Sequence, residues 1–195
     1  MVQSDETLML AVKNGDTEMF SVLFRRHHPR LFAFFYRMTA EASCSEDLAQ
    51  DVFVRILKYR SGFDEHNNFR AWMYQIARNV RADHFRKSPT ESLLQDYSAI
   101  AQQPSPSQHF ERHEQTTMLH QALLALPEEK RELLILARYE EMPYETIAAL
   151  LELDVGTVKV RVHRAIRELR TLFLKMSGEK TECDVKKSST ILRSI

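Results

Sequence analysis

The segment from Tyr144 to Arg164 decides the fold class, and it reads YETIAALLELDVGTVKVRVHR. Its first part predicts a short amphipathic helix with Ile147, Ala148 and Leu151 facing inward. A tight connection at residues 152–154 leads to a second helix. That helix has an apolar row at helical spacing, made of Val158, Val162, Ala165, Ile166, Leu169 and Phe173. Two helices joined by so short a turn predict a helix-turn-helix, whose second helix enters the major groove of DNA.

The outer face of this second helix carries the polar and basic side chains. Early residues of a recognition helix meet base edges, and later arginines meet phosphates. A helical hairpin with a basic exterior is the alternative, and the short turn together with the charge favours DNA binding. The candidate DNA contacts are Thr157, Lys159, Val160, Arg161, His163, Arg164 and Arg167.

Positive and negative charges balance over the 195 residues, but each sign is concentrated in particular segments. Lys+Arg and Asp+Glu both total 27, so the formal net charge is +0. From Arg70 to Lys87 five basic residues accompany one acidic residue, and from Val155 to Lys175 six accompany one. Residues 41–51 hold four acidic residues and no Lys or Arg. One basic helix would most simply be a solvated face, but two in separate parts of the chain indicate phosphate binding.

The whole sequence predicts an all-α protein of two small helical domains joined by a flexible linker. With only 4 Gly and 6 Pro, a turn-rich all-β fold is disfavoured. Asp16 and the capping-box pattern at residues 43–46 mark helix starts, and a further helix runs from about Phe69 to Lys87. The predicted parts are a domain at 1–87, a Pro-, Ser- and Gln-rich linker at 88–111, a helix-turn-helix domain at 112–175 and a tail at 176–195.

Several classes of protein are disfavoured. No apolar run approaches the roughly 20 residues of a membrane helix, and the acidic start lacks a signal-peptide pattern. Cys44 and Cys183 match no disulfide or zinc spacing. The histidines are scattered, and His27-His28 before Pro29 is interpreted as a surface or helix-end pair rather than a metal site. We therefore expect a cytoplasmic protein that is not an enzyme and takes no cofactor, metal or small-molecule substrate.

The helix at residues 69–87 carries a second candidate surface beside its apolar face. Aromatic and amide groups interleaved with arginines suit single-stranded or distorted nucleic acid, whose bases can stack and present their edges. For Trp72, burial in the core and contact with DNA both remain open. Asp83 either belongs to the surface or orients a neighbouring Arg. The stripe consists of Trp72, Gln75, Asn79, Asp83 and Arg86, with Lys87 at its end.

Taken together, these segments resemble bacterial RNA polymerase sigma factors. DLAQDVFVRIL at residues 47–57 and FRAWMYQIARN at 69–79 resemble regions 2.2 to 2.4 of that family. LPEEKRE at 126–132 through VGTVKVR at 155–161 resembles region 4. The resemblance covers about residues 5–87 and 112–173, and the two-domain layout is similar to the extracytoplasmic-function group.

The resemblance implies a specificity subunit that binds core RNA polymerase and directs transcription initiation at promoters. The loop at 61–68, with Phe63, and the stripe of the following helix would hold an unpaired base of the minus-ten element. The helix-turn-helix would contact the minus-thirty-five element and rest on the β flap, and an anti-sigma factor is a further expected partner. The residues implied to contact the β′ clamp helices are Asp47, Gln50, Asp51 and Arg55.

Two positions depart from the family pattern. Glu152 stands where the family often has Gly, which would cost about 1 kcal/mol if the position is left-handed. Val160 stands where a small polar residue is frequent; it could touch a thymine methyl but cannot donate a hydrogen bond.

Two other functions compete with this interpretation. A stand-alone helix-turn-helix regulator explains residues 144–171 but leaves the first 87 residues without a purpose. A protein that imitates a sigma factor to sequester an anti-sigma partner has no need of both basic faces.

Overall fold

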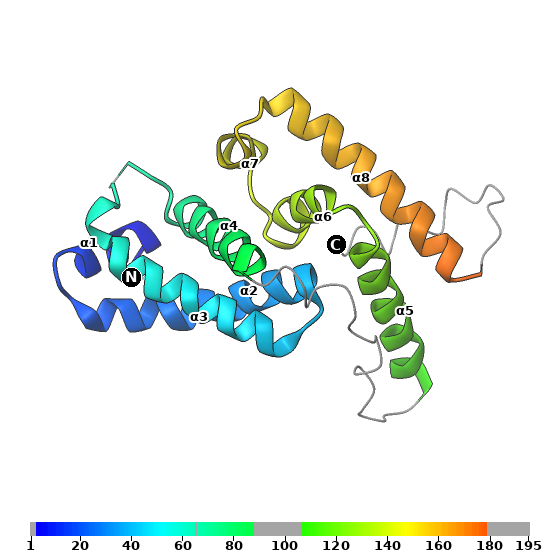
Figure 1. Cartoon of the computed structure of the whole chain (residues 1–195), viewed down its shortest axis with the longest axis horizontal. Coiled ribbons are helices and arrows are strands. Elements are labelled where there is room, and N and C mark those ends of the chain that lie inside the picture. The colour runs from blue at the N-terminus through cyan, green and yellow to red at the C-terminus, as the bar shows by residue number, and fades with distance from the viewer. Residues whose placement is uncertain (1–2, 65, 88–106, 179–195) are drawn as a thin grey trace. The chain divides into compact units, whose positions relative to one another are not determined.

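The computed structural model describes residues 3–64, 66–87 and 107–178, and every regular element within them is a helix (Figure 1). The all-α prediction is therefore confirmed. The chain divides into two compact units, Met1–Ala101 and Gln102–Ile195. Most of the predicted linker, residues 88–106, and most of the predicted tail, residues 179–195, lie outside the described residues.

The first unit is a bundle in which α2 packs against α1 and α3, and α3 packs against α4. Asp16 caps α2 as predicted, because its Oδ1 accepts hydrogen bonds from the backbone N–H groups of Glu18 (3.0 Å) and Met19 (3.3 Å). The helix predicted over residues 69–87 is present with those bounds. The elements are α1 (Asp5–Lys13), α2 (Thr17–Thr39), α3 (Ala42–Tyr59), the short 3₁₀ turn η1 (Arg60–Gly62) and α4 (Phe69–Lys87).

Aromatic rings join the helices of the first unit at its core. Phe34 on α2 meets Phe35 and, edge-on, Tyr74 on α4, with ring centroids 5.2 Å apart in both pairs. All three side chains are fully buried. Burying a side chain of this size stabilises the fold by about 1.5–3 kcal/mol, so these rings fix α4 against α2.

The interpretation of His27-His28 as a surface or helix-end pair is wrong. Both residues lie in the middle of α2, which continues through Pro29 to Thr39. His27 is 2% exposed. Its burial is possible because Asp5 on α1 provides a partner, with His27 Nε2 2.7 Å from Asp5 Oδ2.

The capping box predicted at residues 43–46 is also wrong. α2 ends in a left-handed residue, Ala40 (φ 61°), and α3 already begins at Ala42 with Glu41 as its N-cap. The Ser45 hydroxyl instead donates to the Glu41 carbonyl oxygen at 2.5 Å. The sharp turn between the two helices thus starts α3 before the residues that would have formed the box.

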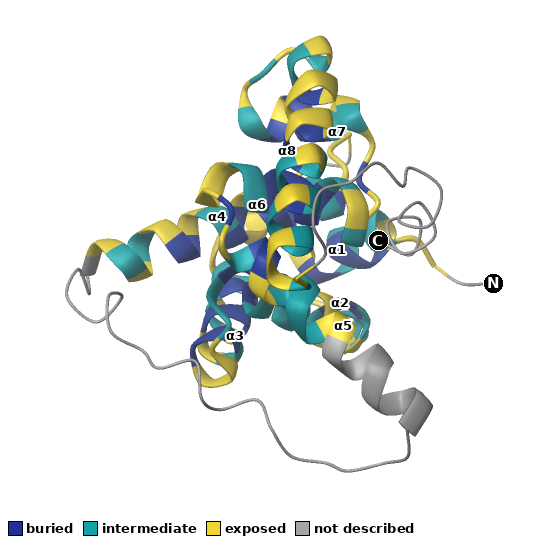
Figure 2. Ribbon diagram, turned by 90° about the vertical axis from the view of Figure 1, so that its right-hand side faces the viewer, coloured by how far each residue is buried: buried dark blue, intermediate teal, exposed yellow. Residues whose placement is uncertain are grey.

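The second unit consists of α5 (Ser107–Leu124), α6 (Glu128–Leu134), the π-helical turn η3 (Ile135–Tyr139), α7 (Tyr144–Leu151) and α8 (Val155–Met176). α5 begins within the segment predicted as linker. α8 packs against α5, α6 and α7. Buried and exposed residues recur along each helix at helical spacing, so that one face of the helix points into the core and the other toward solvent (Figure 2).

The predicted helix-turn-helix is present as α7 and α8. Ile147, Ala148 and Leu150 are buried on α7, with Leu151 half-buried instead of fully inward. Glu152 adopts the left-handed conformation (φ 55°), and the Leu153 N–H donates to the Ala148 carbonyl oxygen at 2.9 Å. A left-handed residue that ends one helix redirects the chain within three residues into the next.

Candidate nucleic-acid interface

α8 presents its predicted DNA-contacting residues along one exposed side. Val158, Val162, Ala165 and Leu169 hold its other side in the core. Val160, 49% exposed, is the large apolar side chain on the outer side. The predicted packing row is thus largely confirmed, with Ile166 and Phe173 half-buried. The predicted DNA contacts that are exposed are Lys159, Val160, Arg161, His163, Arg164 and Arg167.

Thr157 differs from these residues because its hydroxyl is already engaged. Asp154 caps α8, accepting a hydrogen bond from the Thr157 backbone N–H at 2.7 Å and a second, short one from the Thr157 hydroxyl. The hydrogen bond from that hydroxyl is the main reason that the pKa of Asp154 is lowered. With its proton directed at Asp154, the hydroxyl of Thr157 offers lone pairs outward and can accept a hydrogen bond.

The polar stripe of α4 is exposed in its middle and partly engaged at both ends. Gln75 and Asn79 are exposed. Trp72 is half-buried, and its ring meets Phe63 edge-on at 5.2 Å and Phe69 at 6.3 Å. The burial hypothesis for Trp72 holds in part, because the ring packs on the core but is only half-buried, and its contact with DNA stays a prediction.

Asp83 orients arginines in this structure. Its carboxylate accepts a hydrogen bond from Arg86 Nη2 at 2.9 Å on the same helix and one from Arg55 Nη1 at 2.8 Å on α3. The Arg86 side chain is 76% exposed, so its guanidinium is held near Asp83 and open to a phosphate. The Lys87 side chain lies outside the described part of the chain.

Phe63 is not available to nucleic acid. Its side chain is 0% exposed and packs edge-on against Phe69 and Trp72, so the prediction that it contacts DNA directly is not supported by its position. The family resemblance implies that the loop at 61–68, which includes Phe63, holds an unpaired base. In the fold, the Phe63 ring anchors the loop to the core.

The outer side of α3 carries the predicted polymerase contacts together with an exposed apolar residue, Val54, while the exposed Tyr59 ends the helix on another side. Asp47 and Gln50 are exposed and Asp51 is half-buried. Val54 is 62% exposed and Tyr59 50%. Neither residue was among the predicted contacts, although Val54 stands off the buried row of Val52, Phe53 and Ile56 and could have been recognised there.

Arg55 is the fourth predicted polymerase contact, and its guanidinium is occupied by two carboxylates. Nη2 donates to Asp51 at 3.1 Å, one turn earlier on α3, and Nη1 donates to Asp83 on α4. The hydrogen bond to Asp83 is the main cause that raises the pKa of Arg55. The structure thus brings together two residues predicted to bind polymerase, Arg55 and Asp51, and one predicted to bind DNA, Asp83.

Two further residues of functional interest come from α1. Glu6 accepts a hydrogen bond from the Phe69 backbone N–H at 3.1 Å, and Lys13 Nζ donates to the Phe63 carbonyl oxygen at 2.7 Å. The contact of Glu6 with Phe69 spans 63 positions of the sequence, and that of Lys13 with Phe63 spans 50. No local sequence pattern predicts contacts over such separations.

Within residues 3–64, 66–87 and 107–178, no group of three or more His, Cys, Asp or Glu side chains is arranged to hold a metal ion. In the same described residues, no helix is both long and apolar enough to cross a membrane.

Family comparisons match both units in the predicted order. Residues 23–89 match the family model for sigma-70 region 2, and residues 116–169 match that for sigma-70 region 4. The stripe of α4 lies within the first match, and the helix-turn-helix up to Leu169 lies within the second.

Curated relatives cover most of the chain. It is 34% identical over 147 residues to the ECF RNA polymerase sigma factor EcfG of Rhodopseudomonas palustris, covering 74% of this chain and 79% of that protein. Identity to SigW of Bacillus subtilis is 29% over 170 residues, 82% of this chain and 91% of SigW. Identity to SigE of Mycolicibacterium smegmatis is 32% over 161 residues, 80% of this chain but only 62% of SigE.

Two solved structures are similar over most of their length. The sigma factor RpoE from Bartonella quintana, in complex with the anti-sigma factor NepR, gives a TM-score of 0.63 at 28% identity, covering 78% of this chain and 95% of that one. CnrH, in complex with the cytosolic domain of CnrY, has the same fold as this chain, with a TM-score of 0.69 at 24% identity. The match covers 91% of this chain and 100% of that one.

Proposed function

The chain belongs to the bacterial RNA polymerase sigma factors of the ECF group, and from this membership we propose which surface performs each step of initiation. Its function is to bind core RNA polymerase and direct transcription initiation at specific promoters. Residues 1–87 act as the region 2 domain and residues 112–175 as the region 4 domain, with a linker at 88–111 and a tail at 176–195. One observation supports this division above all: each unit has a basic helix with a row of exposed polar residues, and each row falls within the matching family model.

The outer side of α3 binds the polymerase. Asp47 and Gln50 are exposed there beside Val54, so a partner helix can form polar contacts around an apolar centre. The β′ clamp helices are the partner that family membership implies. Burial of Val54 against them would add apolar contact area to a surface otherwise made of polar and charged side chains.

The loop at 61–68 and the stripe of α4 hold the minus-ten element. Capture of a base requires a surface that can stack on it, hydrogen-bond its edge and hold the neighbouring phosphate. The half-buried Trp72 can stack on the base, and the exposed amide of Asn79 can hydrogen-bond its edge. The oriented guanidinium of Arg86 can hold the phosphate. Phe63 supports this surface from below, while Asp83 holds Arg86 in place.

The exposed side of α8 reads the minus-thirty-five element in duplex DNA. Arg164 can make a bidentate contact to guanine, worth roughly 1–3 kcal/mol of discrimination. Val160 contacts a thymine methyl, and Thr157 accepts a hydrogen bond from an exocyclic amino group. Lys159 and Arg167 neutralise phosphates, and the unit also rests on the β flap.

The protein is a non-catalytic subunit that works in the cytoplasm with the polymerase. Its regulation follows from its relatives, since the RpoE similar to it was solved in complex with an anti-sigma factor. We therefore propose that an anti-sigma factor sequesters this chain until a signal releases it.

Reconstituted holoenzyme tests this division of roles with one variant for each surface. Gln50→Ala should weaken binding to core polymerase, Asn79→Ala should reduce strand opening at unchanged core binding, and Arg164→Ala should reduce binding to the minus-thirty-five duplex. Arg138→Ala, an exposed arginine on η3, is the matched control. Equal loss in all three assays for every variant would contradict the assignment.

A further inference from the structure

We propose that α1 is a positioning element for base capture, which holds both ends of the minus-ten loop through Glu6 and Lys13. This inference rests on the proposed role of that loop. α1 spans Asp5–Lys13 and so lies entirely before residue 23, where the match to the region 2 family model begins.

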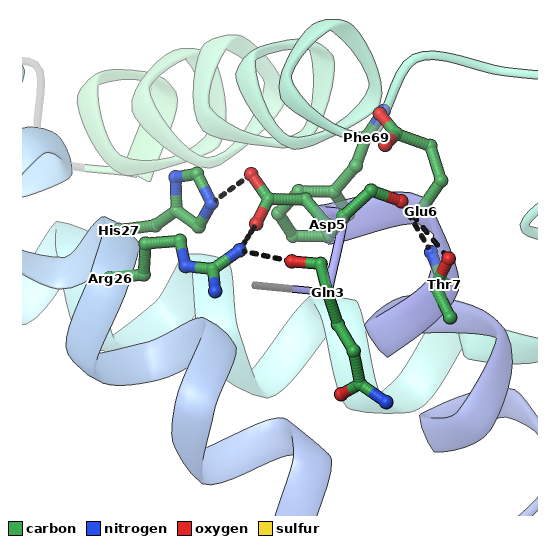
Figure 3. A network of polar contacts seen from close by, with 8 residues as sticks. Gln3, Asp5, Glu6, Thr7, Arg26, His27 and Phe69 are labelled. Atoms are coloured by element: carbon green, nitrogen blue, oxygen red, sulfur yellow. Dashed lines mark hydrogen bonds and ion pairs between the residues drawn. The ribbon is translucent and has the colours of Figure 1, made fainter. Parts of the chain in front are cut away.

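The two contacts fall on the two sides of the loop. Lys13 Nζ donates to the carbonyl oxygen of Phe63, where the chain leaves η1. Glu6 Oε1 accepts from the backbone N–H of Phe69, the first residue of α4. Figure 3 shows Glu6 reaching from α1 toward Phe69. Between these points lie only residues 64–68.

The Glu6 contact meets a specific need of α4. The first N–H groups of a helix have no partner within the helix and carry its positive dipole end. Asn68 satisfies one of them, because its Oδ1 accepts from the Ala71 N–H at 3.0 Å. The Glu6 carboxylate satisfies another, with a charge that the dipole favours, so the start of α4 is held from outside its own sequence.

α1 can act as a support because it is itself fixed to α2. Leu8, Met9 and Val12 are buried. Asp5 accepts a short hydrogen bond from Arg26 and pairs with the buried His27 at 2.7 Å (Figure 3). The His27 ring in turn packs against Phe69 at 5.2 Å. The support therefore runs from α2, through the buried His27 and the half-buried Asp5, to α1 and the loop.

Fixing both loop ends lowers the cost of binding a base. A flexible loop must be ordered when it closes on its ligand, and that loss of entropy weakens binding, whereas a loop already held in shape avoids it. The rings of Phe63 and Phe69, which both contact the Trp72 ring, belong to the two residues whose backbone α1 holds. Release of either end of the loop would let the rings that support Trp72 move.

The test combines variants with removal of bases from the DNA. Holoenzyme is assembled with the full chain and a promoter that the holoenzyme itself selects, and strand opening is followed by 2-aminopurine fluorescence. Each position of the minus-ten non-template strand is replaced in turn by an abasic site. The position whose loss most reduces opening by the wild-type protein marks the captured base.

On the intact promoter, Glu6→Ala and Lys13→Met should each reduce open complex by roughly five- to tenfold. On the promoter lacking the captured base, the same variants should reduce open complex by less than about twofold, because no base is present for the loop to hold. Glu6→Gln and Lys13→Arg, which keep an acceptor and a donor, should retain most of the opening. Glu18→Ala, an exposed acidic residue in the first turn of α2, is the control and should match wild type on both templates.

The two possible failures are distinguishable. If no abasic position affects the wild-type protein, the proposed base capture itself is wrong. If one position does, but Glu6→Ala and Lys13→Met cost the same factor on both templates or cost nothing, α1 is a structural helix only and the inference is overturned. Lys13 is exposed, so Lys13→Met remains available should Glu6→Ala weaken folding.

Discussion

Arg55 on α3 and Asp83 on α4 form an ion pair, with Arg55 Nη1 2.8 Å from Asp83 Oδ2. The pair connects the helix assigned to polymerase binding with the helix assigned to the minus-ten element. Asp83 also holds Arg86, and Arg55 also holds Asp51. A single chain of charges therefore runs from one proposed binding surface to the other.

This pair should be measurable as a coupling energy. Arg55→Ala and Asp83→Ala should each lower the free energy of unfolding. The double variant should lose roughly 1 kcal/mol less than the sum of the two single losses. The value is modest because both side chains keep some contact with water, with 21% and 31% exposed. Urea unfolding followed by Trp72 fluorescence reports on the first unit, since Trp72 is the one tryptophan of the chain. Strict additivity of the two losses would show that the pair contributes nothing.

Phe63 should behave as a core residue. Phe63→Ala should lower the free energy of unfolding by about 3–5 kcal/mol, because it leaves a cavity beneath Trp72 and Phe69. Phe63→Leu keeps most of the volume and should cost only about 1 kcal/mol, with promoter opening close to wild type. A Phe63→Leu protein of normal stability that fails to open promoters would mean that the ring contacts DNA after all.

Glu152 occupies a conformation that glycine adopts without strain. Because its φ is 55°, Glu152→Gly should stabilise the second unit by up to about 1 kcal/mol. Glu145→Gly, in the right-handed first turn of α7, should destabilise it by a similar amount. Urea-dependent hydrogen exchange of peptides from α7 and α8 measures both variants, and the account requires opposite signs.

The arginines of α8 should differ in what their loss changes. Arg164→Ala should reduce the preference for the correct minus-thirty-five sequence by roughly 1–3 kcal/mol. Arg167→Ala should weaken binding to all sequences alike and lower the salt dependence of binding by about one counterion. Titrations of holoenzyme at several salt concentrations, on intact and scrambled minus-thirty-five elements, separate the two effects. An unchanged sequence preference for Arg164→Ala would contradict its role at a base edge.

His27 should make the first unit sensitive to mild acid. Burial lowers the pKa of His27 below its ordinary value of 6.5, with smaller contributions from the positive charges of Arg70 and Arg30, although Asp5 opposes the shift. Below pH 6.5 the unfolded chain therefore takes up a proton that the folded chain resists, so stability falls as the pH decreases. His27 Nδ1 is buried without a hydrogen-bond partner among the described residues, and a proton placed there would lack an acceptor.

His27→Gln should remove this part of the pH dependence while keeping a donor for Asp5. Urea unfolding at about pH 7.5 and about pH 5.5, followed by Trp72 fluorescence, compares the two proteins. An equal loss of stability in wild type and His27→Gln would assign the effect to other groups.

Features set by local pattern could be predicted from the sequence. The packing and contact rows of α8, the cap at Asp16 and the bounds of α4 all follow from spacing within a few residues. Features set by tertiary packing could not. The ion pair of Arg55 with Asp83 spans 28 positions, and the hydrogen bond from Phe69 to Glu6 spans 63.

The wrong predictions have the same origin. His27 resembled a surface residue because its partner, Asp5, belongs to another helix. The burial of Phe63 was missed for the same reason, because the rings that cover it come from α4, and its contact with DNA stays a prediction. The capping box failed because the turn after α2 fixes where α3 starts.

Transcription by core RNA polymerase from a library of random promoters tests the central claim most directly. With the purified protein added, run-off transcripts should derive from templates that share two upstream elements at a fixed spacing. Asn79→Ala should weaken the selection of the minus-ten element, and Arg164→Ala that of the minus-thirty-five element. Failure to bind core polymerase, together with tight binding of duplex DNA by the protein alone, would contradict the account and identify a stand-alone regulator.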